Sequence, residues 1–261
     1  MPAAFSPHVH IPLQRIPDYL ALITAHRLNL EIYFSADCID LLTLSDLSRV
    51  RADLSYGPSL SFHAPFMDLC PAALDSRIRE ATITRFSQIF DIAEVLQPKA
   101  IVFHSGYEKW KYALSVTPWL EKSIELWTPF IERAKTLGIT IAIENIFEDE
   151  PSNLRMLMEA VGSKHFGVCF DTGHFNLFST VPLETWLNEL GRYIVELHLH
   201  DNDRSSDQHL PVGEGIFDFK KLFAALHGQE FISTIENHSP DRVLLSLNRL
   251  AALTSKASSG F

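Results

Sequence analysis

The sequence predicts an α/β fold, a single-domain (β/α)8 TIM barrel that spans residues 1–261. Eight short strand-like segments alternate with eight longer amphipathic segments, and no Gly/Ser-rich linker separates them. This alternation predicts a parallel sheet, and eight strand–helix units is the number that closes a TIM barrel. The length also fits, because such a barrel needs about 250 residues. An open doubly wound sheet is the alternative, but no GxGxxG motif follows the first expected strand.

The expected strands are short runs dominated by apolar residues, as is typical of parallel strands that are buried on both faces. In chain order they are Phe5–Ile11, Leu28–Phe34, Ser59–His63, Ala100–His104, Ile139–Glu144, Phe166–Asp171, Ile194–His198 and Phe231–Glu236.

The expected helices lie between these strands. They are Pro17–His26, Cys38–Val50, Asp75–Leu96, Thr117–Leu137, Ser152–Val161, Leu183–Leu190, Phe219–Leu226 and Pro240–Leu253. In the fourth helix, Ile124, Trp127, Ile131 and Ala134 recur at the spacing of one helical face. Pro98 and Gly138 end the third and fourth helices. Residues 254–261 are expected to form a loose tail.

Composition indicates a cytoplasmic protein. Cys38, Cys70 and Cys169 are unevenly spaced and form no CxxC pair, which indicates reduced thiols and neither a disulfide framework nor a cysteine zinc site. No run of 18 apolar residues and no signal-peptide pattern is visible, so no membrane contact is expected.

The charge balance disfavours nucleic acid as a partner. The net charge is -10, with 22 Lys and Arg against 32 Asp and Glu, and the basic residues form no run. The phosphate backbone of nucleic acid is bound chiefly through Lys and Arg. Nucleic acid is not excluded, since bound divalent cations would reverse the local sign.

Six successive expected strands end on a residue that can bind a metal: His63, His104, Glu144, Asp171, His198 and Glu236. In a TIM barrel the carboxyl ends of all strands meet at one face, where the active site lies. Side chains alternate between the two faces of a strand, so Glu144 shares the inward face with Thr140 and Ala142, and His198 shares it with Glu196. The six residues are therefore expected to converge at the barrel mouth.

The segment after the seventh strand is unusually rich in His and Asp. His198, His200, Asp201, Asp203, Asp207 and His209 fall within twelve positions, a density that indicates ligands for a divalent metal. A polar surface loop is the alternative interpretation of this segment taken alone. We expect His200, Asp201 and Asp203 to be loop or supporting groups. His8 and His10 are weaker candidates from the first strand, and Phe66 and Trp110 are candidates for a substrate-pocket wall.

Glu144, Asp171, His198 and Glu236 form the expected metal-binding set. Three carboxylates and one imidazole make a hard, oxygen-rich site that suits Mn²⁺, Mg²⁺ or Co²⁺ and also admits Zn²⁺.

Five phrases between about His63 and Glu236 resemble the xylose-isomerase-like TIM-barrel superfamily: IENIF, CFDTGHFN, HLHDND, DQHLPVGEG and TIEN. This superfamily includes the sugar-phosphate isomerase/epimerase proteins and the endonuclease IV family. The resemblance implies that Glu144, Asp171, His198 and Glu236 match the single-metal site of ketose 3-epimerases. It also implies that Glu144 and Glu236 are the catalytic acid/base pair.

The resemblance gives a second meaning to five more residues. His63, His104, His174, Asp207 and His209 match the additional ligands of the trinuclear zinc site of endonuclease IV, in which Glu144 would bridge metals. In an isomerase, His174 and the DQH segment would instead contact substrate hydroxyls or a phosphate.

Two functions are therefore expected, and the first is favoured. One is a metal-dependent isomerase or epimerase that transfers a proton through an enediolate of a small sugar, sugar phosphate or related hydroxy-carbonyl compound, with one metal ion. The other is a phosphodiesterase with up to three Zn²⁺. The acidic charge and the lack of Lys/Arg-rich insertions weigh against the second. A dehydratase would use much of the first mechanism, a sensor without turnover is a third class, and a homodimer is possible.

Overall fold

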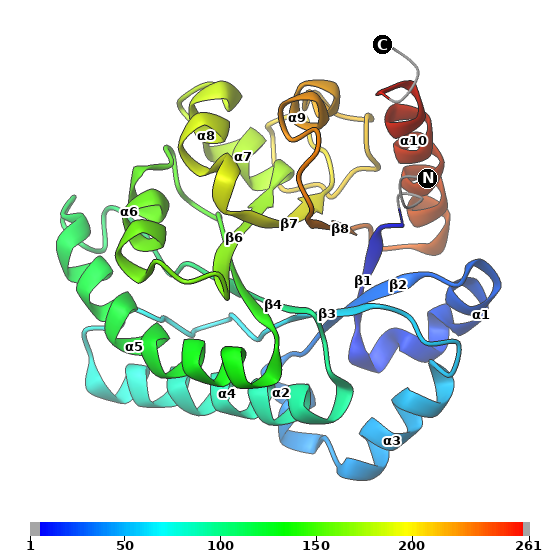
Figure 1. The fold of residues 1–261 in the computed structure, drawn as a ribbon, viewed down its shortest axis with the longest axis horizontal. Helices are drawn as coiled ribbons and strands as arrows, with labels where there is room; N and C mark the ends of the chain where they lie inside the picture. Colours follow the sequence, from blue (N-terminus) through cyan, green and yellow to red (C-terminus); the bar gives the residue numbers. More distant parts are fainter. Residues whose placement is uncertain (1–5, 258–261) are drawn as a thin grey trace.

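The computed structural model describes residues 6–257 and contains a closed barrel of eight parallel strands in sequence order. The predicted fold class is confirmed, and Figure 1 shows the helices arranged around the strands. The strands are β1 (His8–Pro12), β2 (Asn29–Tyr33), β3 (Leu60–His63), β4 (Ala100–His104), β5 (Thr140–Glu144), β6 (Phe166–Asp171), β7 (Ile194–Leu199) and β8 (Ile232–Ile235). All eight overlap the predicted runs; Phe5, the predicted start of the first, lies outside the described residues.

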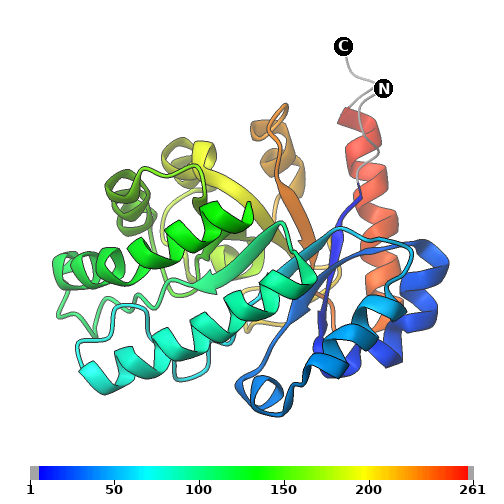
Figure 2. The same cartoon turned by 60° about the horizontal axis from the view of Figure 1, so that its bottom comes forward.

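The helices mostly follow the predicted segments. They are η1 (Leu13–Arg15), α1 (Ile16–His26), α2 (Ala36–Leu41), α3 (Leu44–Asp53), α4 (Ser76–Leu96), α5 (Val116–Leu137), α6 (Ser152–Val161), α7 (Thr172–Phe178), α8 (Leu183–Leu190), η2 (Gly191–Tyr193), α9 (Phe219–Ala225) and α10 (Pro240–Ala257). Figure 2 shows α4 and α5 side by side on the outside of the barrel.

Three helix predictions need correction. The expected helix Cys38–Val50 is two helices, because Thr43 leaves helical geometry to cap α3. The short helix α7 was not predicted, because seven residues are too few for a periodic pattern. The expected tail is wrong at its start: α10 continues through Ala257, and residues 258–261 lie outside the described part.

The core lies between the barrel and its helices. Trp119, Trp127 and Trp186 are fully buried there, and Phe86 stacks on Trp127. Trp110 lies instead in the loop between β4 and α5, where 76% of it is exposed. The large apolar groups thus fix the helices against the strands and leave the barrel interior to smaller or polar side chains.

Two groups of side chains lie in the barrel interior below the mouth. Small apolar side chains form one: Val102, Ala142 and Cys169 pack together, with Val195 against them. Polar groups form the other, in which the Glu196 carboxylate accepts hydrogen bonds from Ser61 Oγ at 3.1 Å and Thr234 Oγ1 at 2.7 Å. The inward direction predicted for Glu196 and Ala142 is therefore correct.

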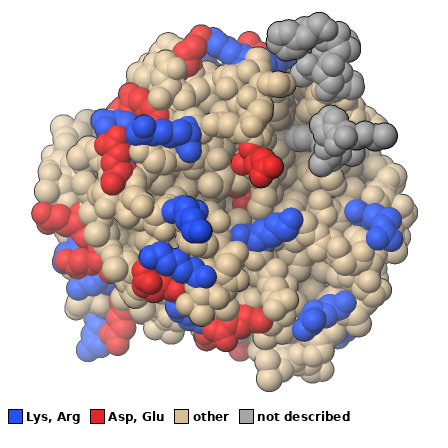
Figure 3. All heavy atoms as spheres, in the orientation of Figure 1, with Lys and Arg blue, Asp and Glu red and all other residues tan. Residues whose placement is uncertain are grey.

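The face of the molecule in Figure 3 is mixed in charge. On the face in Figure 3, Lys and Arg are interspersed with Asp and Glu, so this face has no continuous basic area. Within residues 6–257, no helix is both long and apolar enough to cross a membrane.

Candidate metal centre

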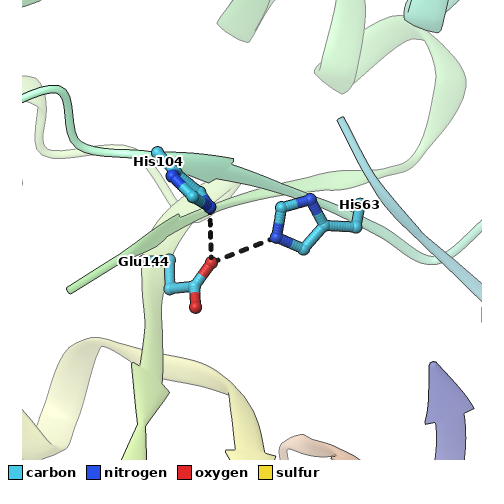
Figure 4. Close-up of side chains that lie close together, drawn as sticks. All are labelled: His63, His104 and Glu144. Carbon is cyan, nitrogen blue, oxygen red and sulfur yellow. Dashed lines mark hydrogen bonds and ion pairs between the residues drawn. The ribbon is translucent and has the colours of Figure 1, made fainter. Parts of the chain in front are cut away.

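The six predicted strand-end residues lie together at one mouth of the barrel. The register of the parallel strands places His104 beside Glu144 and Asp171 beside His198. Figure 4 shows one part of the cluster, in which the Glu144 carboxylate lies between two histidines. Its Oε2 atom is 3.2 Å from His63 Nε2 and 3.4 Å from His104 Nε2.

His198 occupies the centre of the carboxylates. Its Nδ1 atom is 3.2 Å from Glu144 Oε1, 3.3 Å from Glu236 Oε1 and 3.7 Å from Asp171 Oδ2. One ring nitrogen carries at most one proton, so it cannot donate to three carboxylates at once. Donor atoms of this type, converging this closely, fit a divalent metal ion. These are the four residues for which the sequence predicts metal binding.

His174, Asp207 and His209 complete the cluster from α7 and from the loop between β7 and α9. His174 Nδ1 lies 3.2 Å from Glu144 Oε1, and its Nε2 lies 3.5 Å from Asp207 Oδ2. His209 Nε2 lies 3.1 Å from the same Asp207 oxygen. His209 has a φ of 45°, an uncommon value for a residue with a side chain. All nine residues singled out by the sequence are thus brought together, while their roles stay predictions.

Two members of the His/Asp-rich segment support the cluster from below. His200 is fully buried, its Nε2 lies 3.0 Å from Asp171 Oδ2, and its ring stacks on His209 at 3.9 Å. Asp201 is also buried and accepts hydrogen bonds from the backbone N–H groups of Gly213 and Phe217. His200 also belongs to two groups of residues that could hold a metal ion, so the supporting role expected for it stays a prediction.

Glu31 and His10 contact the cluster, and the sequence reasoning missed Glu31. The Glu31 carboxylate is fully buried on β2 and accepts from His10 Nδ1 at 2.9 Å and from His198 Nε2 at 3.1 Å. His10 Nδ1 also lies 3.1 Å from Glu236 Oε1. The sequence did contain a sign of this contact, because Glu31 is a charged residue inside the apolar run NLEIYF. A carboxylate buried in a strand needs a partner. His8 does not reach the mouth, because its Nδ1 bonds Ser61 Oγ at 2.9 Å deeper in the barrel.

Protons on histidines balance the buried carboxylates. Burial by itself raises the pKa of Glu144, but the charge of His198 and hydrogen bonds from histidines hold it well below its ordinary value. Burial also lowers the pKa of His198, yet the carboxylates around it, Glu236, Glu31 and Glu144, raise it well above its ordinary value. Burial lowers the pKa of His104 to about 3, which leaves this ring neutral with a lone pair for a metal. A divalent cation would displace the histidine protons, so its binding would weaken as the pH falls.

A cavity of about 780 Å³ opens above the cluster. Its floor includes Glu144, His174 and Glu236, and Phe66 forms part of its wall, as the sequence led us to expect. Trp110, the other expected wall residue, is not part of the lining. A concave site with convergent polar groups at its base is the usual form of a small-molecule binding site.

Residues 40–253 match the family model described as a xylose isomerase-like TIM barrel. The chain belongs to this family. Among its relatives is MJ1311, an uncharacterized protein of Methanocaldococcus jannaschii, which is 30% identical over 192 residues. That match covers 70% of this chain and 65% of the relative, just under two thirds of its length.

Solved structures of other proteins share the barrel closely. The TTHB071 protein of Thermus thermophilus, soaked with ZnCl2, is 26% identical to this family member, with a TM-score of 0.82 over 97% of this chain and 99% of that one. A D-tagatose 3-epimerase-like protein is 23% identical, with a TM-score of 0.80 over 96% and 98%. Endonuclease IV from Thermus thermophilus is 15% identical, with a TM-score of 0.67 over 97% and 100%. The last two likenesses show the fold alone.

Proposed function

We propose that this family member is a divalent-metal-dependent isomerase or epimerase of a small hydroxy-carbonyl compound, a sugar or a sugar phosphate. The observation that carries the proposal is the convergence of Glu144, Asp171 and Glu236 on Nδ1 of His198 at the floor of a cavity. The resemblance in fold to a D-tagatose 3-epimerase-like protein supports the same reaction class.

Glu144, Asp171, His198 and Glu236 would hold the metal. When bound, a divalent ion polarises a substrate carbonyl group and so acidifies the neighbouring C–H bond. Glu144 and Glu236 are the acid/base pair of the proposal: one removes the proton from carbon, and the other returns a proton. They reach the cavity from β5 and β8, which are separated by two strands, so they approach a bound substrate from different sides.

The neighbouring histidines hold the substrate in this proposal. His63, His104 and His174 lie around Glu144 and face the cavity. The ring nitrogens of histidine can form hydrogen bonds, which suits substrate hydroxyl groups.

Proton exchange with solvent tests the proposed reaction directly. The protein loaded with Mn²⁺ or Co²⁺ is incubated in D₂O with D-fructose, D-tagatose and their phosphates, and deuterium on carbon is followed by NMR. We expect incorporation with at least one substrate and a loss of at least about 100-fold in Glu144→Gln and Glu236→Gln. Glu214→Gln is the matched control, because Glu214 pairs with Arg249 away from the cavity floor. Undiminished exchange in both site variants would refute the two-carboxylate mechanism.

A multinuclear phosphodiesterase is the second candidate, favoured by the five additional ligands. His63 and His104 converge with Glu144. The Asp207 carboxylate lies 3.5 Å from His174 Nε2 and 3.1 Å from His209 Nε2. Metal analysis of protein purified without chelator separates the two proposals. About one equivalent of metal supports the isomerase. About three equivalents of zinc, together with hydrolysis of bis(p-nitrophenyl) phosphate, supports the phosphodiesterase.

A further inference from the structure

The cavity above the metal centre has two chemically different parts. Its floor is the polar cluster, whereas its walls include two groups of apolar side chains, which we call the two apolar banks. The first bank comes from the segment after β3 and from α4, and includes Phe66, Met67 and Ile78. The second bank comes from the loop after β5 and from the end of α7, and includes Phe147 and Phe178.

Aromatic rings in both banks pack against a neighbouring ring, and in the first bank that ring belongs to a candidate metal ligand. Phe66 stacks on the His104 ring at a centroid distance of 4.1 Å. Phe147 and Phe178 form an edge-on pair at 5.2 Å. Met67 is nevertheless 71% exposed and Phe147 55% exposed. Large apolar side chains that line a concave site and are left open to water mark a surface that a ligand covers.

Above its floor, the cavity offers few positively charged side chains that could bind an anionic group. Lys111 is the basic side chain among the described lining residues, apart from the histidines. Its Nζ lies 3.6 Å from Glu108, and Asp68 adds a further carboxylate to the lining. Phosphate groups are usually recognised by several Arg, Lys or backbone N–H donors. The upper walls therefore favour an uncharged apolar group over a phosphate.

The volume of the cavity also favours a substrate with an apolar group. A cavity of about 780 Å³ lies within the range of about 300–1,000 Å³ that holds drug-sized ligands. A free hexose has no apolar group that could cover the two banks. We infer that the substrate carries an alkyl or aryl group attached to its metal-chelating hydroxy-carbonyl end, and that this group lies between Phe66 and Phe147. The inference rests on the metal centre of the proposed function and names the substrate class for it.

Hydroxamates of different chain length test the inference, because the hydroxamate head chelates a metal while the tail varies. The affinities of acetohydroxamate, hexanohydroxamate and octanohydroxamate for the Zn²⁺-loaded protein are measured by calorimetry. We expect roughly a fourfold gain for each methylene group buried, and at least about 100-fold between the shortest and longest probes. Octanamide, which has the tail without the chelating head, is expected to bind at least tenfold more weakly than octanohydroxamate.

Substitutions in the two apolar banks test where the alkyl chain of the hydroxamate binds. Phe147→Ser and Met67→Ser are expected to weaken octanohydroxamate about tenfold and to leave acetohydroxamate unchanged. Leu44→Ser is the matched control, because Leu44 is 75% exposed on α3 outside this cavity. Equal affinity for all three chain lengths, with acetohydroxamate still bound, would overturn the inference and leave the metal centre standing. Failure of acetohydroxamate to bind the metal-loaded protein would instead overturn the proposed metal centre, and the inference with it.

Discussion

At the scale of single residues, the most consequential side chain is Glu31. It bonds Nε2 of His198, the ring whose Nδ1 faces the three carboxylates of the proposed metal site. A carboxylate on the far nitrogen of a histidine fixes the orientation and tautomer of the ring and makes it a better ligand. Glu31 is thus expected to act on the metal through His198, without contacting the metal itself.

The substitution Glu31→Gln is therefore expected to weaken binding of Zn²⁺ or Mn²⁺ about tenfold, because His198 loses its charged partner. Calorimetric titration of metal into chelator-treated protein measures the change. Glu214→Gln removes a carboxylate that pairs with Arg249 on the surface and should leave the affinity unchanged. Identical affinities in wild type and Glu31→Gln would show that Glu31 does not position the ring.

The residues of the candidate site could be predicted where they end a strand, and not where they lie within one. His63, Glu144 and Asp171 each close an apolar run, so the fold class alone places them at the barrel mouth. Glu31 stands in the middle of β2, and it meets His198 only through the register and closure of the barrel. That neighbourhood depends on strands far apart in the sequence, which periodicity does not report.

At the scale of elements, the short helix α7 couples the fold to the cluster. Asp171 caps its N-terminus by accepting from the backbone N–H of His174 at 2.6 Å, so one carboxylate serves the helix and the cluster. Gly173 lies under the His200 ring, and a Cβ atom there would approach His200 Cε1 within 2.0 Å. Glycine at this position is what allows the buried histidine to pack against the helix.

We expect Gly173→Ala to destabilise the protein by about 1–3 kcal/mol and to weaken metal binding, since His200 must move from its contact with Asp171. Urea unfolding and metal titration measure the two effects. Gly191→Ala is the matched control, because its backbone is already helical and the nearest atom to an added Cβ lies 4.0 Å away. Equal losses in both variants would contradict the assigned role of Gly173.

The break between α2 and α3 is held by a cap. Thr43 Oγ1 accepts from the backbone N–H of Asp46, and the Asp46 carboxylate accepts from the N–H of Thr43. We expect Thr43→Ala to cost about 1 kcal/mol of stability by urea unfolding. Ser48→Ala within the same helix should cost less, because the Ser48 hydroxyl bonds only the Leu44 carbonyl one turn back. The Thr-x-x-Asp spacing is visible in the sequence and could have separated the two helices, whereas the seven residues of α7 offered no comparable pattern.

At the scale of the whole molecule, the candidate metal centre joins most of the barrel, from β1 through β8. A ligand that binds only the folded protein stabilises it, by about 2.7 kcal/mol at a free concentration about one hundred times its Kd. Removal of metal with a chelator is therefore expected to lower Tm by roughly 5–10 °C for a protein of this size. Differential scanning calorimetry measures the shift, and Asp171→Asn should lose most of the response. A wild-type Tm independent of metal would contradict a metal held at this site.

The strands of the barrel are not all paired over the same length. β1 and β8 share two register pairs, whereas every other pair of neighbouring strands shares three to five. The contact of His10 with Glu236 crosses this same seam. The pairing of β1 with β8 is therefore the shortest in the barrel, and Glu236, one of the two proposed acid/base groups, also links these two strands through His10. Local opening of the barrel should require the least free energy between β1 and β8, and a cation bound at Glu236 should raise that free energy.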